Sequence, residues 1–115
     1  HLKNFSLIRL PDGHYELSPA YDLVPVRIIM PEDKEDLALT LQGRKSNLKR
    51  ADFERFGAAL QLSEIQIRKA VSHLVLAVSK ALPTVLQTSF LPQEMQEQIA
   101  SLVRRQTQRL QVENG

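Results

Sequence analysis

Two oxygen-bearing side chains flank a sequence that is typical of a β-hairpin. Asn4 precedes an apolar segment and Asp22 follows a second, alternating one, with the turn signal Pro11–Gly13 between them. If the turn centres near Asp12, the numbers of cross-strand partners add to about 24, so Asn4 lies opposite about Ala20. Asp22 then lies two residues, or roughly 7 Å, further along the strand. Amide and carboxylate oxygens are hard ligands that suit Mg²⁺. The spacing is compatible with a magnesium site, but a single Asn and a single Asp are also common on solvated surfaces.

Further short elements are predicted in the first third of the chain. The apolar segments Val26–Met30 and Leu37–Leu41 are predicted as short strands, separated by a charged surface turn at Pro31–Asp36. Such short strands do not form a stable sheet alone, so this region is expected to belong to a larger unit.

The rest of the chain has helical periodicity. Apolar residues at three-to-four-residue spacing predict a helix that closes near Gln61. Ser63 and Gln66 form a capping-box signature before a long apolar stripe that contains Pro83, and Pro92 starts a third helix. The fold class is therefore α+β, mostly α: an N-terminal hairpin and short strands over residues 1–43, then a three-helix bundle over residues 44–115. Both parts are expected to form one domain.

Composition excludes several classes of protein. The 115 residues include 15 Lys and Arg against 13 Asp and Glu, 43% hydrophobic residues and no Cys, which is the composition of an ordinary globular domain. Disulfides, thiolate zinc sites and cysteine nucleophiles are thus excluded within these residues. The sequence contains no uninterrupted run of about 18 apolar residues and no secretory signal pattern at its start, so a soluble protein is expected.

The other candidate ligands and cations are interpreted structurally. His14 is expected to be exposed, and His73 has no second ligand at metal spacing. Basic residues form two clusters, which favour a solvated face over a partner surface: Arg44, Lys45, Lys49 and Arg50; Arg104, Arg105 and Arg109. Because only 5% of the residues are aromatic, direct nucleic-acid binding by base stacking is not expected.

The two ends of the hairpin resemble the catalytic and metal-binding segments of HipA-like serine/threonine kinases, the toxins of bacterial toxin–antitoxin pairs. That family's catalytic loop reads Asp-x-His-x-x-Asn, and its metal-binding Asp lies in a Pro-x-Tyr-Asp segment after a β-hairpin. His1 and Asn4 match the end of the first motif, and Pro19, Tyr21 and Asp22 match the second. The resemblance is strong over the first 25 residues and continues as a pattern through the helical part.

This resemblance implies transfer of the γ-phosphate of ATP to a serine or threonine of a protein target. It assigns Asn4 and Asp22 to Mg²⁺ and through it to the nucleotide. It places His1 in the catalytic loop, where it orients the loop or the transferred phosphate. Lys3 would neutralise phosphate charge, although a lysine at such a place is often simply solvated. Tyr21 is expected to be a packed aromatic. The implied partners are the protein substrate and a DNA-binding antitoxin of the HipB type, with no membrane, in the bacterial cytoplasm.

The chain also departs from that family's pattern. The catalytic Asp belongs two positions before His1, and neither it nor the nucleotide-binding lobe is among these 115 residues. The sequence is therefore expected to be a C-terminal fragment of a kinase that is inactive alone. The alternative is a non-catalytic helical interaction module in which Asn4 and Asp22 are inert. Only the kinase hypothesis requires these two side chains to converge within about 5 Å of each other across one metal position.

Overall fold

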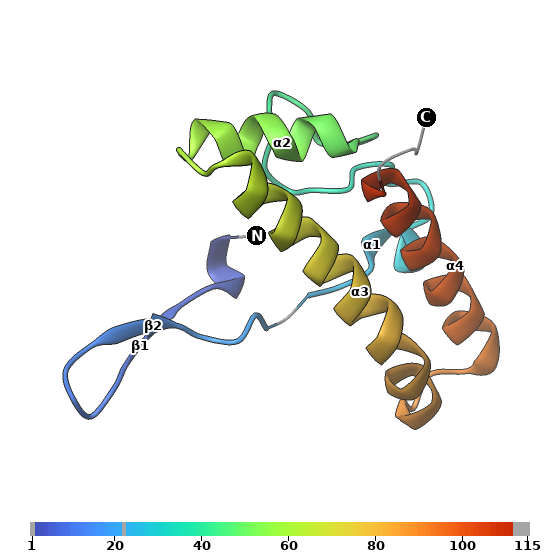
Figure 1. The fold of residues 1–115 in the computed structure, drawn as a ribbon. Coiled ribbons are helices and arrows are strands. Elements are labelled where there is room, and N and C mark those ends of the chain that lie inside the picture. The colour runs from blue at the N-terminus through green and yellow to red at the C-terminus, as the bar shows by residue number, and fades with distance from the viewer. Residues whose placement is uncertain (1, 22, 112–115) are drawn as a thin grey trace.

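The computed structural model describes residues 2–21 and 23–111 (Figure 1). The elements in chain order are the 3₁₀ helix η1 (Leu2–Asn4), strands β1 (Leu7–Arg9) and β2 (Tyr15–Leu17), and helices α1 (Val26–Ile29), α2 (Arg50–Ala59), α3 (Glu64–Thr88) and α4 (Gln93–Leu110). The expected fold class, α+β and mostly α with an N-terminal hairpin and three longer helices, is confirmed.

The hairpin has the register that its turn predicts. The numbers of all three antiparallel pairs add to 24: Leu7–Leu17, Ile8–Glu16 and Arg9–Tyr15. Gly13 has φ +90°, a conformation that favours glycine, and its N–H donates to the Leu10 carbonyl at 2.9 Å. All six strand residues are exposed, and the hairpin extends away from the helices (Figure 1).

The strand expected at Val26–Met30 is wrong, because these residues form helix α1. The N–H of Ile28 donates to the Pro25 carbonyl at 2.9 Å, and the N–H of Met30 donates to the Val26 carbonyl at 2.7 Å. Proline before a helix has its φ already near the helical value, here −76° at Pro25. A short, mostly apolar segment does not by itself distinguish a strand from a helical turn.

The strand expected at Leu37–Leu41 is also wrong. These residues form an irregular loop with one isolated bridge, between Leu41 and Arg44. The N–H groups of Asp36 and Leu37 both donate to the Lys45 carbonyl, at 2.7 and 3.0 Å. This shared acceptor closes the loop on itself and leaves no ladder partner for the alternating leucines.

The α2–α3 corner forms as the sequence predicts. Gln66 N–H donates to Ser63 Oγ at 3.3 Å, and Ser63 N–H donates to Gln66 Oε1 at 2.8 Å, which completes the capping box. Helix α2 packs against α3 at Gly57, which is buried. A Cβ placed on Gly57 would lie 2.6 Å from Ile67 Cγ1, so the absence of a side chain permits this close approach.

Helix α4 follows Pro92 and packs back along α3, while α1 packs on α4 (Figure 1). Pro83 lies inside α3, which continues as one helix to Thr88. The buried apolar side chains of the described residues are few: Leu48, Ile67 and Leu86. Helix α3 is also the one described helix long and apolar enough, by length and composition, to cross a membrane.

The molecule is open for its size. Its accessible surface is 9410 Å², whereas a compact monomer of this mass has roughly 6,400 Å². Its radius of gyration is 16.1 Å, against about 13.4 Å for a compact domain of the same length. Much apolar surface therefore remains uncovered.

Candidate functional site

The base of the hairpin joins the two segments that carry the predicted motifs. Ser18 N–H donates to the Ser6 carbonyl at 2.8 Å, and the two serine hydroxyl oxygens lie 3.1 Å apart. One step further, the N–H of Tyr21 donates to the carbonyl of Asn4 at 3.4 Å. The backbone at Asn4 therefore meets the backbone of the residue that immediately precedes Asp22.

Two of the four predicted site residues belong to the described part of the chain. Lys3 is exposed and Asn4 is half-buried, both in η1. His1 and Asp22 lie outside the described residues. Tyr21 is 48% exposed, so the packed aromatic expected at this position is wrong for these 115 residues.

The donor set at this place fits a hard cation. An amide oxygen from Asn4 and a carboxylate oxygen from Asp22 belong to the ligand types that Mg²⁺ takes, and Mg²⁺ commonly keeps waters and phosphate oxygens in its other positions. The hydrogen bond from the Tyr21 N–H to the Asn4 carbonyl brings the backbones of the two segments together. Elsewhere in residues 2–21 and 23–111, no three His, Asp or Glu side chains gather as metal ligands.

The two described histidines are both exposed. His14 lies beside Asp12, with Nδ1 3.0 Å from Oδ2, and its backbone N–H donates to Asp12 Oδ1 at 3.0 Å. These two hydrogen bonds, the side-chain one first, lower the pKa of Asp12. His73 is exposed on α3. The sequence interpretation of His14 as an exposed residue is confirmed.

A second polar cluster surrounds Asp36, which sequence reasoning placed in a charged surface turn. Its side chain is only 12% exposed, and Oδ1 lies 3.0 Å from Arg27 Nη2. Gln106 Nε2 donates to the same oxygen at 3.2 Å, and the backbone N–H of Asn47 donates to Oδ2 at 3.0 Å. Asp36 therefore ties the loop to α1 and α4. The one feature of the sequence that could have indicated the partial burial of Asp36 is its position directly before the apolar Leu37.

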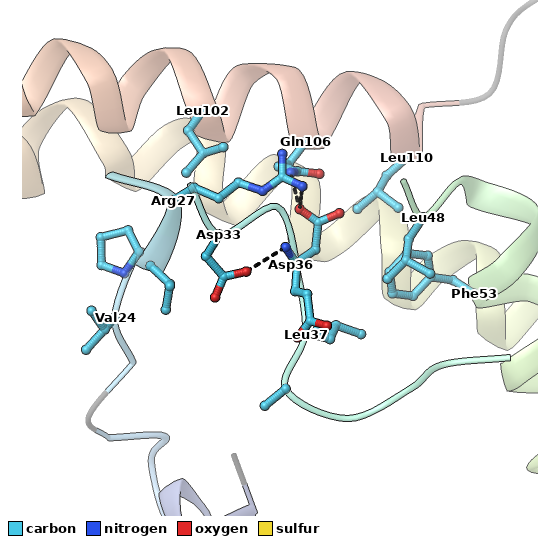
Figure 2. Close-up of a pocket in the computed structure, with 14 residues that line it drawn as sticks. Val24, Arg27, Asp33, Asp36, Leu37, Leu48, Phe53, Leu102, Gln106 and Leu110 are labelled. Atoms are coloured by element: carbon cyan, nitrogen blue, oxygen red, sulfur yellow. Dashed lines mark hydrogen bonds and ion pairs between the residues drawn. The ribbon is translucent and has the colours of Figure 1, made fainter. Parts of the chain in front are cut away.

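A cavity of about 480 Å³ lies beside this cluster (Figure 2). Apolar side chains from the segment after Asp22, from α2 and from α4 supply most of its wall, and Asp36 and Arg27 project at its centre. Neither Lys3 nor Asn4 lines it. The cavity is therefore a gap between packed elements and is separate from the hairpin base.

Most cations of the first basic cluster have partners within the chain. Arg44 Nη1 lies 3.9 Å from Asp52, Lys45 Nζ lies 3.3 Å from Glu35, and Arg50 Nε lies 2.8 Å from Glu54. This pairing agrees with a structural role for the cluster.

Asp52 is the most buried charged residue of the described chain, at 1% exposed. It accepts a hydrogen bond from the Lys49 backbone N–H at 2.8 Å and from Arg55 at 2.5 Å. The Lys49 bond is the first cause that lowers the pKa of Asp52; Arg44 and Arg55 add to this, whereas burial opposes it. Asp52 therefore caps α2, and nothing places it near the hairpin base.

Comparison with known proteins adds one finding. The family model described as the HipA-like C-terminal domain matches residues 1–82. The match begins at the first motif, spans the hairpin, and ends within α3. No curated protein matches the chain.

Proposed function

Because the chain belongs to the HipA-like C-terminal domain family, we propose that it is the C-terminal part of a protein kinase that transfers the γ-phosphate of ATP to serine or threonine. The observation that supports this most is the hydrogen bond from Tyr21 to Asn4, which joins the end of one motif to the other. The family also supports a toxin–antitoxin context. A DNA-binding antitoxin of the HipB type is then the proposed partner, and the bacterial cytoplasm the proposed location.

In this proposal Asn4 and Asp22 hold Mg²⁺ through their side-chain oxygens. Mg²⁺ held there would neutralise phosphate charge on ATP. Lys3, which is exposed beside Asn4, would lie against phosphate oxygens, and His1 would orient the catalytic loop. The catalytic base and the nucleotide-binding lobe would come from outside these 115 residues, so the chain alone would bind the metal weakly and transfer no phosphate.

A hairpin is a suitable support for such a pair of ligands. The register fixes which residues of the two motifs are opposite each other, because a shift by one residue would reverse the face on which every side chain lies. The paired serines at the base, Ser6 and Ser18, add a side-chain link just before the site. The strand residues contribute little buried area, so their role is to set this alignment.

One observation favours a second candidate, a non-catalytic helical interaction module. The described chain exposes many large apolar side chains on its helices as well as on its hairpin. Extended apolar surface of this kind marks interaction sites. This candidate requires nothing of Asn4 and Asp22, so substitution of both would leave partner binding unchanged.

The two candidates are separated by substituting Asp22 in the full-length kinase. Asp22→Asn removes the charge of the ligand while keeping the size of the side chain. We expect incorporation of radioactive γ-phosphate to fall by more than about 100-fold. Substituting residues that only hydrogen-bond to metal ligands already lowers metal affinity or activity by about 10- to 100-fold. Asp12→Asn is the matched control, because Asp12 is an exposed carboxylate on the same hairpin. The control should retain the wild-type rate.

A second readout does not depend on turnover. Mn²⁺ replaces Mg²⁺ at oxygen sites, so its affinity for the 115-residue chain, measured by electron paramagnetic resonance, should weaken in Asp22→Asn and in Asn4→Ala but not in Asp12→Asn. Wild-type phosphate transfer by Asp22→Asn would refute the kinase proposal and leave the interaction module.

A further inference from the structure

Helix α3 has one broad apolar side, and α2 and α4 cover only part of it. Ile67 and Leu86, which are buried, belong to the part that packs on α2 and α4. The adjoining uncovered part, called here the α3 stripe, consists of exposed residues spaced four, three, four and four apart: Ala70, Leu74, Ala77, Ala81 and Val85. At 100° per residue, these five fall within an arc of about 80°. Leu74 and Val85 are 58% and 59% exposed.

The spacing and residue types of the α3 stripe match a seam between two helices. A four-three alternation keeps residues along one side of a helix, as at the contact positions of paired helices. Alanine at three of the five positions lets a second helix backbone approach closely, while Leu74 and Val85 supply larger side chains. The width of the stripe suits one helix.

Charges along one edge of the stripe define what kind of helix fits. Lys69, His73 and Lys80 fall within an arc of about 40° on the side away from α2 and α4, and all three are exposed. In the described chain neither lysine has a carboxylate within ion-pair distance. The one acidic residue of α3 is Glu64, in its first turn. A complementary helix would carry carboxylates along the corresponding edge.

The same charges disfavour antiparallel pairing with a second copy of this chain. Antiparallel pairing of two stripes places like edges together, so Lys69 and Lys80 would face the same residues of the other copy. Like charges that face each other across an interface are destabilising. The uncovered area is nevertheless large, since the chain exposes about 3,000 Å² more than a compact monomer of its mass, and a standard interface buries roughly 1,600 Å².

We propose that the α3 stripe is the docking surface for an acidic amphipathic helix that the remainder of the kinase contributes. This inference rests on the proposed function, because that function requires further polypeptide to supply the base and the nucleotide lobe. The helix would place aliphatic side chains between Leu74 and Val85 and a row of Glu or Asp against Lys69 and Lys80. Docking there would join the helical part of this chain to the lobe that holds the nucleotide.

The chemistry is tested first on the 115-residue chain. The probes are two blocked 21-residue helical peptides with the same Ala and Leu seam, one with Glu along its edge and one with Lys. In fluorescence anisotropy at low salt we expect the Glu peptide to bind about five- to tenfold more tightly. The variant carrying both Lys69→Glu and Lys80→Glu should reverse this preference. Equal binding of both peptides, or an unchanged preference in the variant, would overturn the proposal.

The occupant is tested by cysteine labelling, which the absence of cysteine from this chain makes simple. Leu74→Cys lies on the stripe, and Ser72→Cys is a matched control at an exposed position on the opposite side of α3, away from both the stripe and the two lysines. In the 115-residue chain both should react with maleimide, and the Glu peptide should protect only position 74. In the polypeptide translated from the complete reading frame, position 74 should be protected at least about tenfold relative to the isolated chain.

Three other results would assign the stripe differently and overturn the proposal. Equal labelling of position 74 in the isolated chain and the longer polypeptide would leave the stripe uncovered. Protection that appears only when the chain dimerises would identify a second copy. Protection by phosphatidylcholine–phosphatidylglycerol vesicles, without a preference for the Glu peptide, would identify a membrane. If the full-length protein transfers no phosphate but position 74 is protected in it, the proposed function is refuted and the docking surface stays in place.

Discussion

Replacing Gly57 by Ala tests whether the α2–α3 corner depends on the absence of a side chain. In an ordinary helix this change is favourable by about 0.8–1 kcal/mol, because alanine loses less backbone entropy on folding. Here the added Cβ would lie 2.6 Å from Ile67 Cγ1 and 2.8 Å from Ile67 Cδ1. Carbon atoms in contact prefer about 3.5–4.0 Å, so the two helices or the Ile67 side chain must move by roughly 1 Å.

That movement is costly because Ile67 is 7% exposed and is one of the few buried apolar side chains. Overpacking of this kind costs typically about 1–3 kcal/mol. Subtracting the helix-propensity gain leaves an expected net destabilisation of about 1 kcal/mol. The measurement is urea unfolding of the wild-type and variant chains followed by circular dichroism at 222 nm.

A double-mutant cycle with Ile67→Ala isolates the contact. Ile67→Ala alone should destabilise by about 2–5 kcal/mol, but it removes all three atoms that approach the new methyl group. In that background Gly57→Ala should therefore become stabilising, by about 1 kcal/mol. Stabilisation by Gly57→Ala in the wild-type background would refute the close-approach explanation, as would the same sign in both backgrounds.

Two further predictions concern the carboxylates of Asp36 and Asp52. Asp36→Ala should lower the free energy of unfolding by about 1–3 kcal/mol, because Arg27 and the Asn47 N–H lose a part-buried acceptor. Asp33→Ala should cost less in the same urea titration, because the Asp33 side chain, on the same loop, accepts a hydrogen bond from the exposed Glu35 N–H. Asp52 should stabilise the chain in a pH-dependent way: its pKa is lower when folded than the ordinary 3.8, so the unfolded chain binds the proton more readily. Its contribution is then complete above pH 3.8 and is lost as pH falls below that value toward the folded pKa. Asp52→Asn should therefore flatten the decline of the melting temperature between pH 4 and 2, and an unchanged acid slope would contradict this.

Local signals predicted the elements whose ends are marked by particular residues. The Pro11–Gly13 turn determined the hairpin register, and the Ser63–Gln66 capping box determined the start of α3. Each depends on contacts within a few residues, so the sequence contains the whole cause. The magnesium pair at Asn4 and Asp22 stays a prediction, supported by the Tyr21–Asn4 hydrogen bond beside it.

The wrong predictions depend on contacts between distant residues. Val26–Met30 formed α1, and this helix lies against α4, more than 60 positions later. The Leu37–Leu41 loop is held by Asp36, whose partner Gln106 is separated from it by 70 positions. No local pattern contains these contacts. For the same reason Asp36 was assigned to a solvated turn, since six charged and turn-forming residues in succession usually lie at the surface.

The exposed hairpin also has a consequence for protein engineering. Its tip makes hydrogen bonds only within itself in the described chain, between Leu10, Asp12, Gly13 and His14. Extending both strands by equal numbers of residues would preserve the alignment at Ser6 and Ser18, because the added pairs lie beyond the existing ones. The tip is therefore a natural insertion point for an epitope tag or a fluorescent reporter. The distance between the two motifs along the sequence can thus vary while their distance in space stays the same.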